Sequence, residues 1–378
     1  MENKHKKRIV LVANSTWNFF NFRLNLIETL VARGYEVILL SPVDQYLPAL
    51  LKQINIRHIA LKKLDRKSVN PFKEQALYRE FKRIYKELNP DLIIHYTIKP
   101  NLFGNWAAKS LGIPSVCVVT GLGYVFLHDT LLNAAIKQAY KKSLLKADLV
   151  VFENEEDKEQ FIEEGFVKSN NAETVNGCGI NLEHFKQAPE ITYDDDKMVF
   201  TFLARLIYDK GIIEFIEAAK DVKSRYPSIE FWVAGEVDDG NPTSIKNELL
   251  YEWVEKGIIK YFGHVRDVRP IIAKSGCVVL PSYREAMART LTEALAMGKP
   301  VITCDTSGCK AVVDDGINGF LVPVKNITAL ADTIEKFYLL PEETKQMMGR
   351  SGRKKVESQF DDVIVTGQYL NLIDQLIF

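Results

Sequence analysis

Two glutamates, Glu285 and Glu293, stand eight positions apart after the apolar run Cys277–Leu280. On one continuous helix they would lie about 12 Å apart along the axis and point in different directions, so they converge on one ligand only if a loop intervenes. Pro281 ends the apolar run, and Thr290 followed three residues later by Glu293 has the pattern of a capping box. The sequence therefore predicts Glu285 in a loop and Glu293 in the first turn of a helix. The simpler alternatives are a solvated loop acid and a capping residue.

Two cations follow another apolar run, Val199–Ala204. Arg205 comes directly after this run, and Lys210 stands at the start of the next helical pattern. Cations beside a helix N-terminus can bind a diphosphate and stabilise the negative charge of a leaving group. An ordinary exposed loop with two charges is the alternative interpretation.

Polar residues and glycines also follow the strand-like runs of the first half, and seven of them are candidate ligand contacts: Asn14, Ser15, Arg23, His95, Lys99, Gly121 and Gly123. In an open parallel sheet, ligands bind outside the carboxyl ends of the strands, which is where these residues are expected. The two glycines would let backbone amides approach a phosphate, although they lack the third glycine of a dinucleotide fingerprint. A lone histidine such as His95 is more often a structural residue with its hydrogen bonds satisfied.

The elements that must position these residues are predicted by an alternation of short β-branched runs with longer amphipathic ones, which is typical of parallel βαβ units. The strands expected in the first half are Ile9–Ala13, Glu36–Leu40, Arg57–Ala60, Asp91–His95, Ser115–Val119, Leu149–Phe152 and Thr174–Val175. Those expected in the second half are Val199–Ala204, Glu230–Ala234, Ile259–Phe262, Cys277–Leu280 and Val301–Cys304. Helical patterns include Phe20–Arg33, Leu131–Lys146 and Asp361–Leu376.

The alternation breaks near Ile180–Lys197, where a proline and an acidic cluster interrupt any period. A chain of 378 residues is too long for one ordinary core and accommodates two α/β domains. We predict an α/β fold with an N-terminal Rossmann-like domain over residues 1–180 and a second over residues 181–360. Residues 361–378 are expected to form a helix that returns to the first domain.

The charge of the chain is balanced, with 49 basic and 49 acidic residues, so composition indicates no nucleic-acid partner. Residues 1–147, however, hold about 23 Lys and Arg against about 10 Asp and Glu, an excess of roughly +13. Within them, one side of the Leu131–Lys146 pattern carries Lys137, Lys141, Lys142 and Lys146. A solvated basic surface is one interpretation, and attraction to anionic lipid or to a diphosphate is the other.

The N-terminus, Met1–Arg8, is basic but lacks the long apolar region of a signal peptide. No apolar stretch approaches the roughly 18–20 residues of a membrane span. The five cysteines show no metal-ligand spacing and indicate reduced thiols. These features predict a cytoplasmic protein whose membrane contact is peripheral.

The two motifs of the second half together resemble a known family. Glu285, Glu293 and the residues that follow, through Gly308 and Asp315–Phe320, are similar to the C-terminal signature of the retaining family-4 glycosyltransferases. The segment from Arg205 to Lys210 resembles the Arg-Leu…Lys-Gly motif of the same family. The resemblance implies the GT-B fold, in which two Rossmann-like domains face each other across a cleft and the C-terminal helix crosses back.

The resemblance also implies roles for these residues. It assigns Glu285 to hydroxyls of the donor sugar and Glu293 to the ribose of the nucleotide, and it makes Arg205, Lys210 and Glu285 the expected catalytic groups. The family usually has Gly, and often Pro, near the first acid, where this chain has Ala286 and Ala288. The remaining residues expected to bind the donor are Arg289, Thr290, His264, Val265, Asn14 and Ser15.

The motifs of the first half are similar to those of family-4 enzymes that extend polyprenyl-diphosphate-linked oligosaccharides. This implies transfer of a hexose or N-acetylhexosamine from a UDP-sugar, with retention, in cell-surface polysaccharide or glycan assembly at the cytoplasmic face of an anionic membrane. No metal or other cofactor is expected, because two cations and a helix N-terminus take the place of a metal ion. The residues expected to bind the acceptor are Arg23, His95, Lys99, Gly121 and Gly123. A UDP-sugar epimerase of the same fold and a catalytically weak sugar-nucleotide-binding protein are the alternatives.

Overall fold

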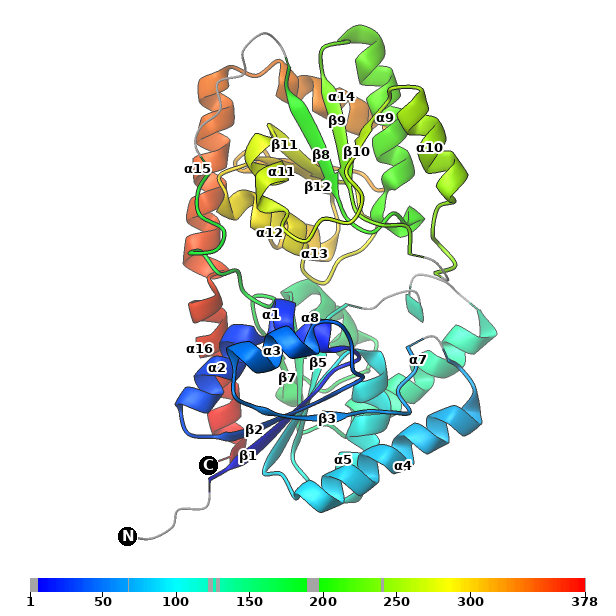
Figure 1. Cartoon of the computed structure of the whole chain (residues 1–378), viewed down its shortest axis with the longest axis vertical. Coiled ribbons are helices and arrows are strands. Elements are labelled where there is room, and N and C mark those ends of the chain that lie inside the picture. The colour runs from blue at the N-terminus through cyan, green and yellow to red at the C-terminus, as the bar shows by residue number, and fades with distance from the viewer. Residues whose placement is uncertain are drawn as a thin grey trace. The chain divides into compact units, whose positions relative to one another are not determined.

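The computed structural model describes residues 6–66, 68–121, 125–126, 130–188, 197–238 and 241–377. The chain divides into two compact units, each containing a parallel sheet flanked by helices (Figure 1). Unit 1 comprises Met1–Gly179 with Asp362–Phe378, and unit 2 comprises Ile180–Asp361. The boundaries expected from the sequence, 180/181 and 360/361, each lie one residue from those found. The predicted α/β class with two Rossmann-like units is confirmed.

The sheet of unit 1 is parallel throughout, in the order β3-β2-β1-β4-β5-β6-β7. Its strands are β1 (Arg8–Val12), β2 (Glu36–Ser41), β3 (Arg57–Ala60), β4 (Leu92–Tyr96), β5 (Ser115–Val119), β6 (Leu149–Phe152) and β7 (Ala172–Thr174). Its helices are α1 (Thr16–Phe22), α2 (Leu24–Ala32), α3 (Leu47–Gln53), α4 (Pro71–Leu88), the π-helical turn η1 (Pro100–Gly104), α5 (Asn105–Ser110), α7 (Leu131–Leu144), α8 (Glu155–Glu163), the 3-10 turn η2 (Ser169–Asn171) and α16 (Asp362–Ile377).

Both faces of this sheet are buried, because successive side chains of a strand point to opposite faces. From β1, Ile9 and Leu11 pack with residues of α2 and α16. Val10 and Val12 pack with residues of α4 and α5 on the other face. The C-terminal helix therefore completes the core of unit 1, as the pattern over Asp361–Leu376 predicted.

A single helix over Phe20–Arg33 was expected, but the structure has two helices that meet at Arg23. Arg23 leaves the helical conformation, with φ −130° and ψ 6°. Its guanidinium is buried, donates to Glu153 Oε1 at 2.9 Å and lies 4.5 Å from the ring centroid of Tyr96. It also reaches the hydroxyl of Tyr369 on α16 at 3.4 Å. These contacts argue against the predicted role of Arg23 in binding the acceptor, because they enclose its side chain within unit 1.

The sheet of unit 2 is also parallel, in the order β10-β9-β8-β11-β12-β13. Its strands are β8 (Val199–Leu203), β9 (Glu230–Ala234), β10 (Lys260–Tyr261), β11 (Cys277–Leu280), β12 (Val301–Cys304) and β13 (Gly319–Val322). Its helices are the 3-10 turn η4 (Tyr208–Lys210), α9 (Ile212–Arg225), α10 (Asn247–Glu255), α11 (Arg269–Lys274), α12 (Arg289–Ala296), α13 (Ser307–Lys310), α14 (Ile327–Tyr338) and α15 (Glu342–Gln359). The edge strand β13 was not predicted as a strand.

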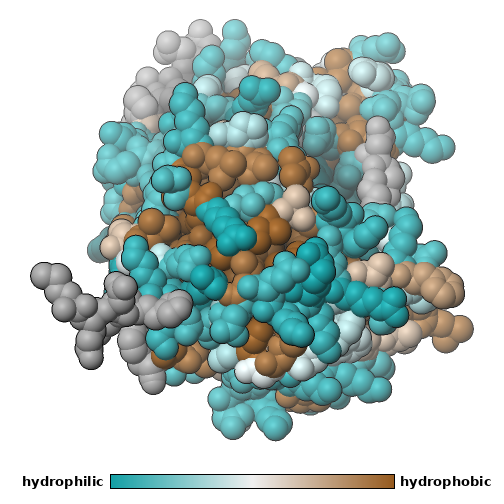
Figure 2. All heavy atoms as spheres, turned by 60° about the horizontal axis from the view of Figure 1, so that its bottom comes forward, coloured by the Kyte–Doolittle hydropathy of each residue, from teal (hydrophilic) through white to brown (hydrophobic). Residues whose placement is uncertain are grey.

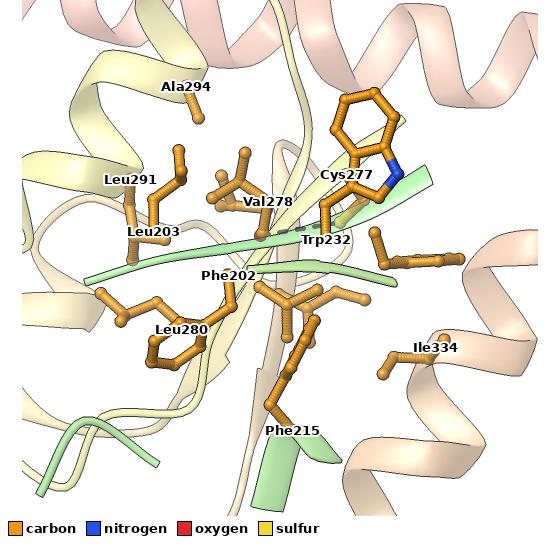
Figure 3. Packing of buried hydrophobic residues seen from close by; sticks show 14 of the residues in the cluster. Phe202, Leu203, Phe215, Trp232, Cys277, Val278, Leu280, Leu291, Ala294 and Ile334 are labelled. Carbon is orange, nitrogen blue, oxygen red and sulfur yellow. Dashed lines mark hydrogen bonds between the residues drawn. The ribbon is translucent and has the colours of Figure 1, made fainter. Parts of the chain in front are cut away.

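The core of unit 2 has a layer of helices on each side of the sheet. Figure 3 shows Leu291 and Ala294 of α12 on one side, and Phe215 of α9 with Ile334 of α14 on the other. All four side chains are fully buried. The strands that carry candidate residues at their carboxyl ends are thus held in the interior, which fixes where their loops begin.

The burial of Arg23 leads to a prediction about stability. Arg23→Ala leaves Glu153 buried without its cation, and breaking a buried ion pair costs about 3–5 kcal/mol in free energy of unfolding. The matched control is Arg33→Ala, because Arg33 pairs with Asp374 of α16 through exposed side chains. An exposed pair contributes about 1 kcal/mol or less. Urea denaturation measures both variants, and an equal loss of stability in the two would contradict the buried pairing.

Candidate active site

Two loops at the carboxyl edge of the unit 2 sheet bring together a lysine and a glutamate that are 75 residues apart. Lys210 lies in η4 after β8, and Glu285 lies in the loop between β11 and α12. The ammonium of Lys210 donates to Glu285 Oε1 at 2.5 Å, and both side chains are mostly buried. Because β8 and β11 are parallel neighbours, their following loops emerge side by side. The loop position predicted for Glu285 is therefore what the structure shows, and two of the three expected catalytic groups are in contact.

Hydrogen bonds to the backbone join the two loops, in addition to the Lys210–Glu285 ion pair. The amide of Tyr283 donates to the carbonyl of Asp209 at 2.9 Å. The hydroxyl of Ser282 donates to the same carbonyl at 3.2 Å. Gly211 has φ +76°, and a Cβ there would lie 2.1 Å from the carbonyl oxygen of Pro281. Only glycine permits both the left-handed conformation and this close approach.

The start of α13, after β12, also holds the backbone of Glu285. The amide of Gly308 donates to the carbonyl of Glu285 at 3.2 Å, and a Cβ on Gly308 would meet that oxygen at 2.4 Å. Ala286 and Ala288, where this chain departs from the family pattern, are buried in the same loop. The carboxylate of Glu285 thus projects from a backbone held at two places.

The predicted capping box of the following helix is wrong. Helix α12 begins at Arg289, and its N-cap, Ala288, has no side chain that could cap it. The hydroxyl of Thr290 instead donates to the carbonyl of Leu203 at 3.0 Å, which ties α12 to the end of β8. Glu293 lies in the second turn and accepts a hydrogen bond from Nε of Arg289 at 2.7 Å. Its carboxylate is therefore not used in capping.

Arg205, the third expected catalytic group, follows β8 but pairs with a different acid. Its Nη1 donates to Asp238 Oδ2, beyond β9, at 2.7 Å, and about half of the side chain is exposed. Arg205 and Lys210 thus both follow β8, but each forms an ion pair with a different acid. Helix α9 begins just after Lys210, so its free backbone amides add positive potential at this edge.

The remaining donor candidates belong to segments outside this pair of loops. His264 follows β10, with Nδ1 3.8 Å from a carboxylate oxygen of Glu236, and Val265 packs partly buried against the unit 2 core. Asn14 and Ser15 belong to unit 1, where the hydroxyl of Ser15 accepts from the amide of Asn18 and caps α1.

The acceptor candidates of unit 1 are mostly turned into the fold. His95 is fully buried and hydrogen-bonds to the hydroxyl of Tyr85 at 3.0 Å, which contradicts its predicted contact with an acceptor. Lys99 is largely buried and donates to Glu74 Oε1 at 2.5 Å and to the carbonyl of Ser68 at 2.7 Å. Gly121 follows β5 with φ +125°, as expected of a backbone that needs glycine. Gly123 lies outside the described residues.

Two residues of unit 2 that the sequence interpretation missed belong to the same two segments as Lys210 and Glu285. The hydroxyl of Tyr283 donates to Glu214 Oε1, on the first turn of α9, at 2.8 Å. Glu214 stands in the apolar run Ile212–Ile216, and a carboxylate within a buried face is the signal that could have identified it.

Two kinds of feature are absent from the described part of the chain. There, His, Cys, Asp and Glu form no group of three or more that could hold a metal ion. None of the described helices combines the length and apolar character needed to cross a bilayer.

The chain matches two family models in succession. Residues 8–154 match the model described as Glycosyl transferase 4-like, and residues 184–355 match the model described as Glycosyl transferases group 1. Two parallel Rossmann-like units and these two matches, which together cover most of the chain, define the class: the chain is a glycosyltransferase of the GT-B fold, similar to the family-4 type.

Named relatives agree with this class. The chain is 28% identical to the N,N'-diacetylbacillosaminyl-diphospho-undecaprenol alpha-1,3-N-acetylgalactosaminyltransferase of Campylobacter jejuni, over 98% of this chain and 99% of that protein. It is 27% identical, over 74% of each chain, to the UDP-Gal:alpha-D-GlcNAc-diphosphoundecaprenol alpha-1,3-galactosyltransferase of Escherichia coli. Its fold is similar to that of Anabaena HepE in complex with UDP and glucose, with a TM-score of 0.80 at 19% identity over 98% and 100% of the chains. The epimerase alternative is not favoured, because these relatives are transferases.

The burial of His95 leads to a prediction about pH. Burial lowers the pKa of His95 from 6.5 to about 3, so the folded chain keeps its imidazole neutral. Below pH 6.5 the unfolded chain binds a proton at this residue that the folded chain does not bind. The free energy of unfolding should therefore fall as the pH decreases from this value, by up to about 1.4 kcal/mol per pH unit from this residue.

Urea denaturation of the wild type and of His95→Gln between about pH 4 and 8 measures this effect. The difference between the two chains should be constant above neutral pH, where it reflects packing alone, and should change in favour of the variant as the pH falls. Parallel curves over the whole range would show that His95 is not the source.

Proposed function

We propose that this glycosyltransferase moves a hexose or N-acetylhexosamine from a UDP-sugar to a polyprenyl-diphosphate-linked saccharide, with retention of the anomeric configuration. The observation that carries the proposal is the contact between Lys210 and Glu285 at the carboxyl edge of the unit 2 sheet. A sugar nucleotide needs a cation for its diphosphate and an acceptor of hydrogen bonds for its sugar hydroxyls, and this contact supplies both within one site. The names of the Campylobacter jejuni and Escherichia coli relatives support the lipid-linked acceptor.

In the proposed site, unit 2 binds the donor. Glu293 accepts hydrogen bonds from the ribose, and Glu285 accepts them from hydroxyls of the sugar. Lys210, Arg205 and the amides at the start of α9 face the diphosphate. As the bond from the anomeric carbon to the diphosphate breaks, negative charge grows on the departing UDP, and nearby fixed cations stabilise that charge.

No protein base and no metal ion take part in the proposed transfer. The acceptor hydroxyl attacks the anomeric carbon on the face from which UDP departs, and its proton passes to the leaving phosphate oxygen. The bond that forms joins the acceptor oxygen to the sugar, and the bond that breaks joins the sugar to UDP. In the unit 2 site, positive charge comes from Lys210, Arg205 and a helix N-terminus.

The direct test incubates the protein with radiolabelled UDP-hexoses and UDP-N-acetylhexosamines and with a panel of synthetic polyprenyl-diphosphate-linked saccharides. Label should move into the lipid-linked product, and product analysis should show the configuration of the donor. EDTA should leave the rate nearly unchanged, whereas its loss on chelation and recovery with Mn²⁺ would contradict the metal-free scheme. Epimerised or hydrolysed donor as the main product would contradict transfer to this acceptor class.

The proposed roles predict different kinetic effects for two residues of the site. Lys210→Ala should lower kcat about 100-fold or more, because the cation acts on charge that grows in the transition state. Glu293→Ala should chiefly weaken UDP binding, by about 1.5–3 kcal/mol, because a ribose hydroxyl loses a charged hydrogen-bond partner.

Calorimetry with UDP and steady-state kinetics separate these effects. Lys220→Ala is the matched control, because Lys220 lies on α9 and pairs with Glu217 on an exposed surface of the same unit. Near-normal turnover of the Lys210 variant, or unchanged UDP affinity of the Glu293 variant, would remove that residue from the scheme.

We further propose a peripheral contact with an anionic membrane, at the cytoplasmic face, through unit 1. The surface of unit 1 shown in Figure 2 is largely hydrophilic but includes an exposed apolar area. At the start of α7, Leu131 is 93% exposed. The same face of the helix carries the exposed residues Ala135, Gln138 and Lys142. An exposed apolar end followed by lysines is the composition of a segment that lies on a lipid surface.

The structure changes which lysines of the segment Leu131–Lys146 are expected to contact lipid. Lys141 donates to the carbonyl of Glu164 at 2.8 Å, and Lys137 lies 5.7 Å from the ring centroid of Phe126, so both turn towards unit 1 itself. Lys142 and Lys146 are exposed. The expectation that all four lysines share one outward surface is therefore wrong.

Binding to anionic vesicles tests this contact. Leu131→Ser combined with Lys142→Gln and Lys146→Gln should weaken binding about tenfold or more, because each lysine contributes about 1 kcal/mol near an anionic surface. Lys137→Gln combined with Lys141→Gln is the matched control and should have a smaller effect. Sedimentation with vesicles at increasing salt measures both. Equal losses in the two variants would place the membrane contact elsewhere.

A further inference from the structure

A carboxylate that is not part of the proposed chemistry is buried close to it. Glu214 occupies the third position of α9, and the residue is 7% exposed. Oε1 accepts from the hydroxyl of Tyr283 at 2.8 Å, whereas Oε2 has no hydrogen-bond partner among the residues that the structure describes. Burying a carboxylate is unfavourable unless its oxygens are hydrogen-bonded. The position near the N-terminus of α9 offsets part of this cost, and Tyr283 provides the hydrogen bond.

Tyr283 is held at three places in the loop that carries Glu285. Its amide donates to the carbonyl of Asp209 at 2.9 Å, and its hydroxyl reaches Glu214. The ammonium of Lys325, in the loop after β13, lies 4.7 Å from its ring centroid. Burial and the nearby Glu214 carboxylate raise the pKa of Tyr283, so its hydroxyl remains protonated and able to donate.

The geometry connects this hydrogen bond to the reacting groups on both sides. Glu214 lies four residues after Lys210, and Tyr283 lies two residues before Glu285. The Tyr283–Glu214 bond therefore joins the same two segments as the Lys210–Glu285 contact, from the side of α9. The bonds to the carbonyl of Asp209 hold the start of the loop. The Tyr283–Glu214 bond adds a side-chain attachment to α9, which the ion pair between the long side chains of Lys210 and Glu285 does not provide.

We propose that Tyr283 and Glu214 are positioning residues, whose hydrogen bond fixes the loop bearing Glu285 relative to Lys210 during sugar transfer. The inference rests on the proposed function, because it assumes that Lys210 and Glu285 act on a sugar nucleotide. Neither Tyr283 nor Glu214 touches the reacting atoms in this scheme. A displacement of the loop by a fraction of an ångström would misplace Glu285 and thereby slow the reaction.

Tyr283→Phe removes only the hydroxyl and should lower kcat about tenfold, which corresponds to about 1.4 kcal/mol in transition-state stabilisation. UDP affinity should change little, because the variant leaves in place the proposed contacts of UDP with Glu293, Arg205 and the amides of α9. The matched control is Tyr226→Phe. The hydroxyl of Tyr226 donates to Glu335 Oε1 at 2.7 Å, so the control removes the same kind of bond at the opposite end of α9. The control should lower stability without lowering kcat.

A double variant distinguishes positioning from simple stabilisation. In Glu214→Met with Tyr283→Phe, both partners are apolar, and removal of both partners of a buried hydrogen bond is far less costly than removal of one. Its melting temperature should recover relative to Tyr283→Phe, whereas its kcat should remain about tenfold low because the loop still lacks its bond to α9. Recovery of kcat together with the melting temperature would overturn the inference and leave the pair with a structural role.

The wild-type protein separates a failure of this inference from a failure of the proposed function. Wild type that neither binds UDP in calorimetry nor transfers sugar from any UDP-sugar contradicts the proposed function. Wild type that is active, with kcat unchanged in Tyr283→Phe, contradicts the positioning role alone. A lower kcat in both Tyr283→Phe and Tyr226→Phe would also contradict it, because loss of stability would then account for the effect.

Discussion

The proposed chemistry depends on one contact, the ion pair between Lys210 and Glu285. Two long charged side chains on the surface would hold each other weakly, because solvent screens them and their freedom of rotation opposes a fixed geometry. Here both side chains are mostly buried, and the backbone after Lys210 approaches the loop of Glu285 closely at Gly211. Gly308, after β12, approaches the backbone of Glu285 as closely. A less polar environment strengthens the interaction, and the restrained backbones reduce the entropy lost in forming it. A cation and a carboxylate are thus available at one defined place.

That place is set by the parallel sheet rather than by the loops themselves. Strands β8 and β11 are hydrogen-bonded neighbours whose side chains are buried between α12 on one face and α9 with α14 on the other (Figure 3). The loops therefore begin at fixed points. Ala286 and Ala288, where this chain departs from the family pattern, are buried in the loop after β11. This loop is fixed by contacts with Asp209, Glu214 and Gly308. None of these contacts requires glycine at position 286 or 288.

Unit 1 shows that a polar residue expected near the carboxyl edge of a sheet need not face a ligand. Arg23 and His95 occupy positions expected for acceptor contacts, yet both are buried and bonded to side chains of their own unit. The carboxyl ends of strands are also where helices begin and pack, so polar groups there can join one helix to another. Arg23 does this for α16, and its ion pair with Glu153 satisfies two charges that burial would otherwise disfavour.

The sequence by itself determined the two Rossmann-like units, nearly all their strands and the two loops of the site, because these follow from local patterns of apolar residues and from short motifs. It could not determine what depends on contacts between distant residues. The helix break at Arg23 follows from its partners Tyr96 on β4, Glu153 just after β6 and Tyr369 on α16. The start of α12 at Arg289 follows from the bond between Thr290 and β8. The edge strand β13 forms because β12 offers it a pairing partner. The tertiary structure alone decided which cation pairs with which acid. Lys210 could pair with Glu285, and Arg205 with Asp238, only after parallel strands had aligned their loops.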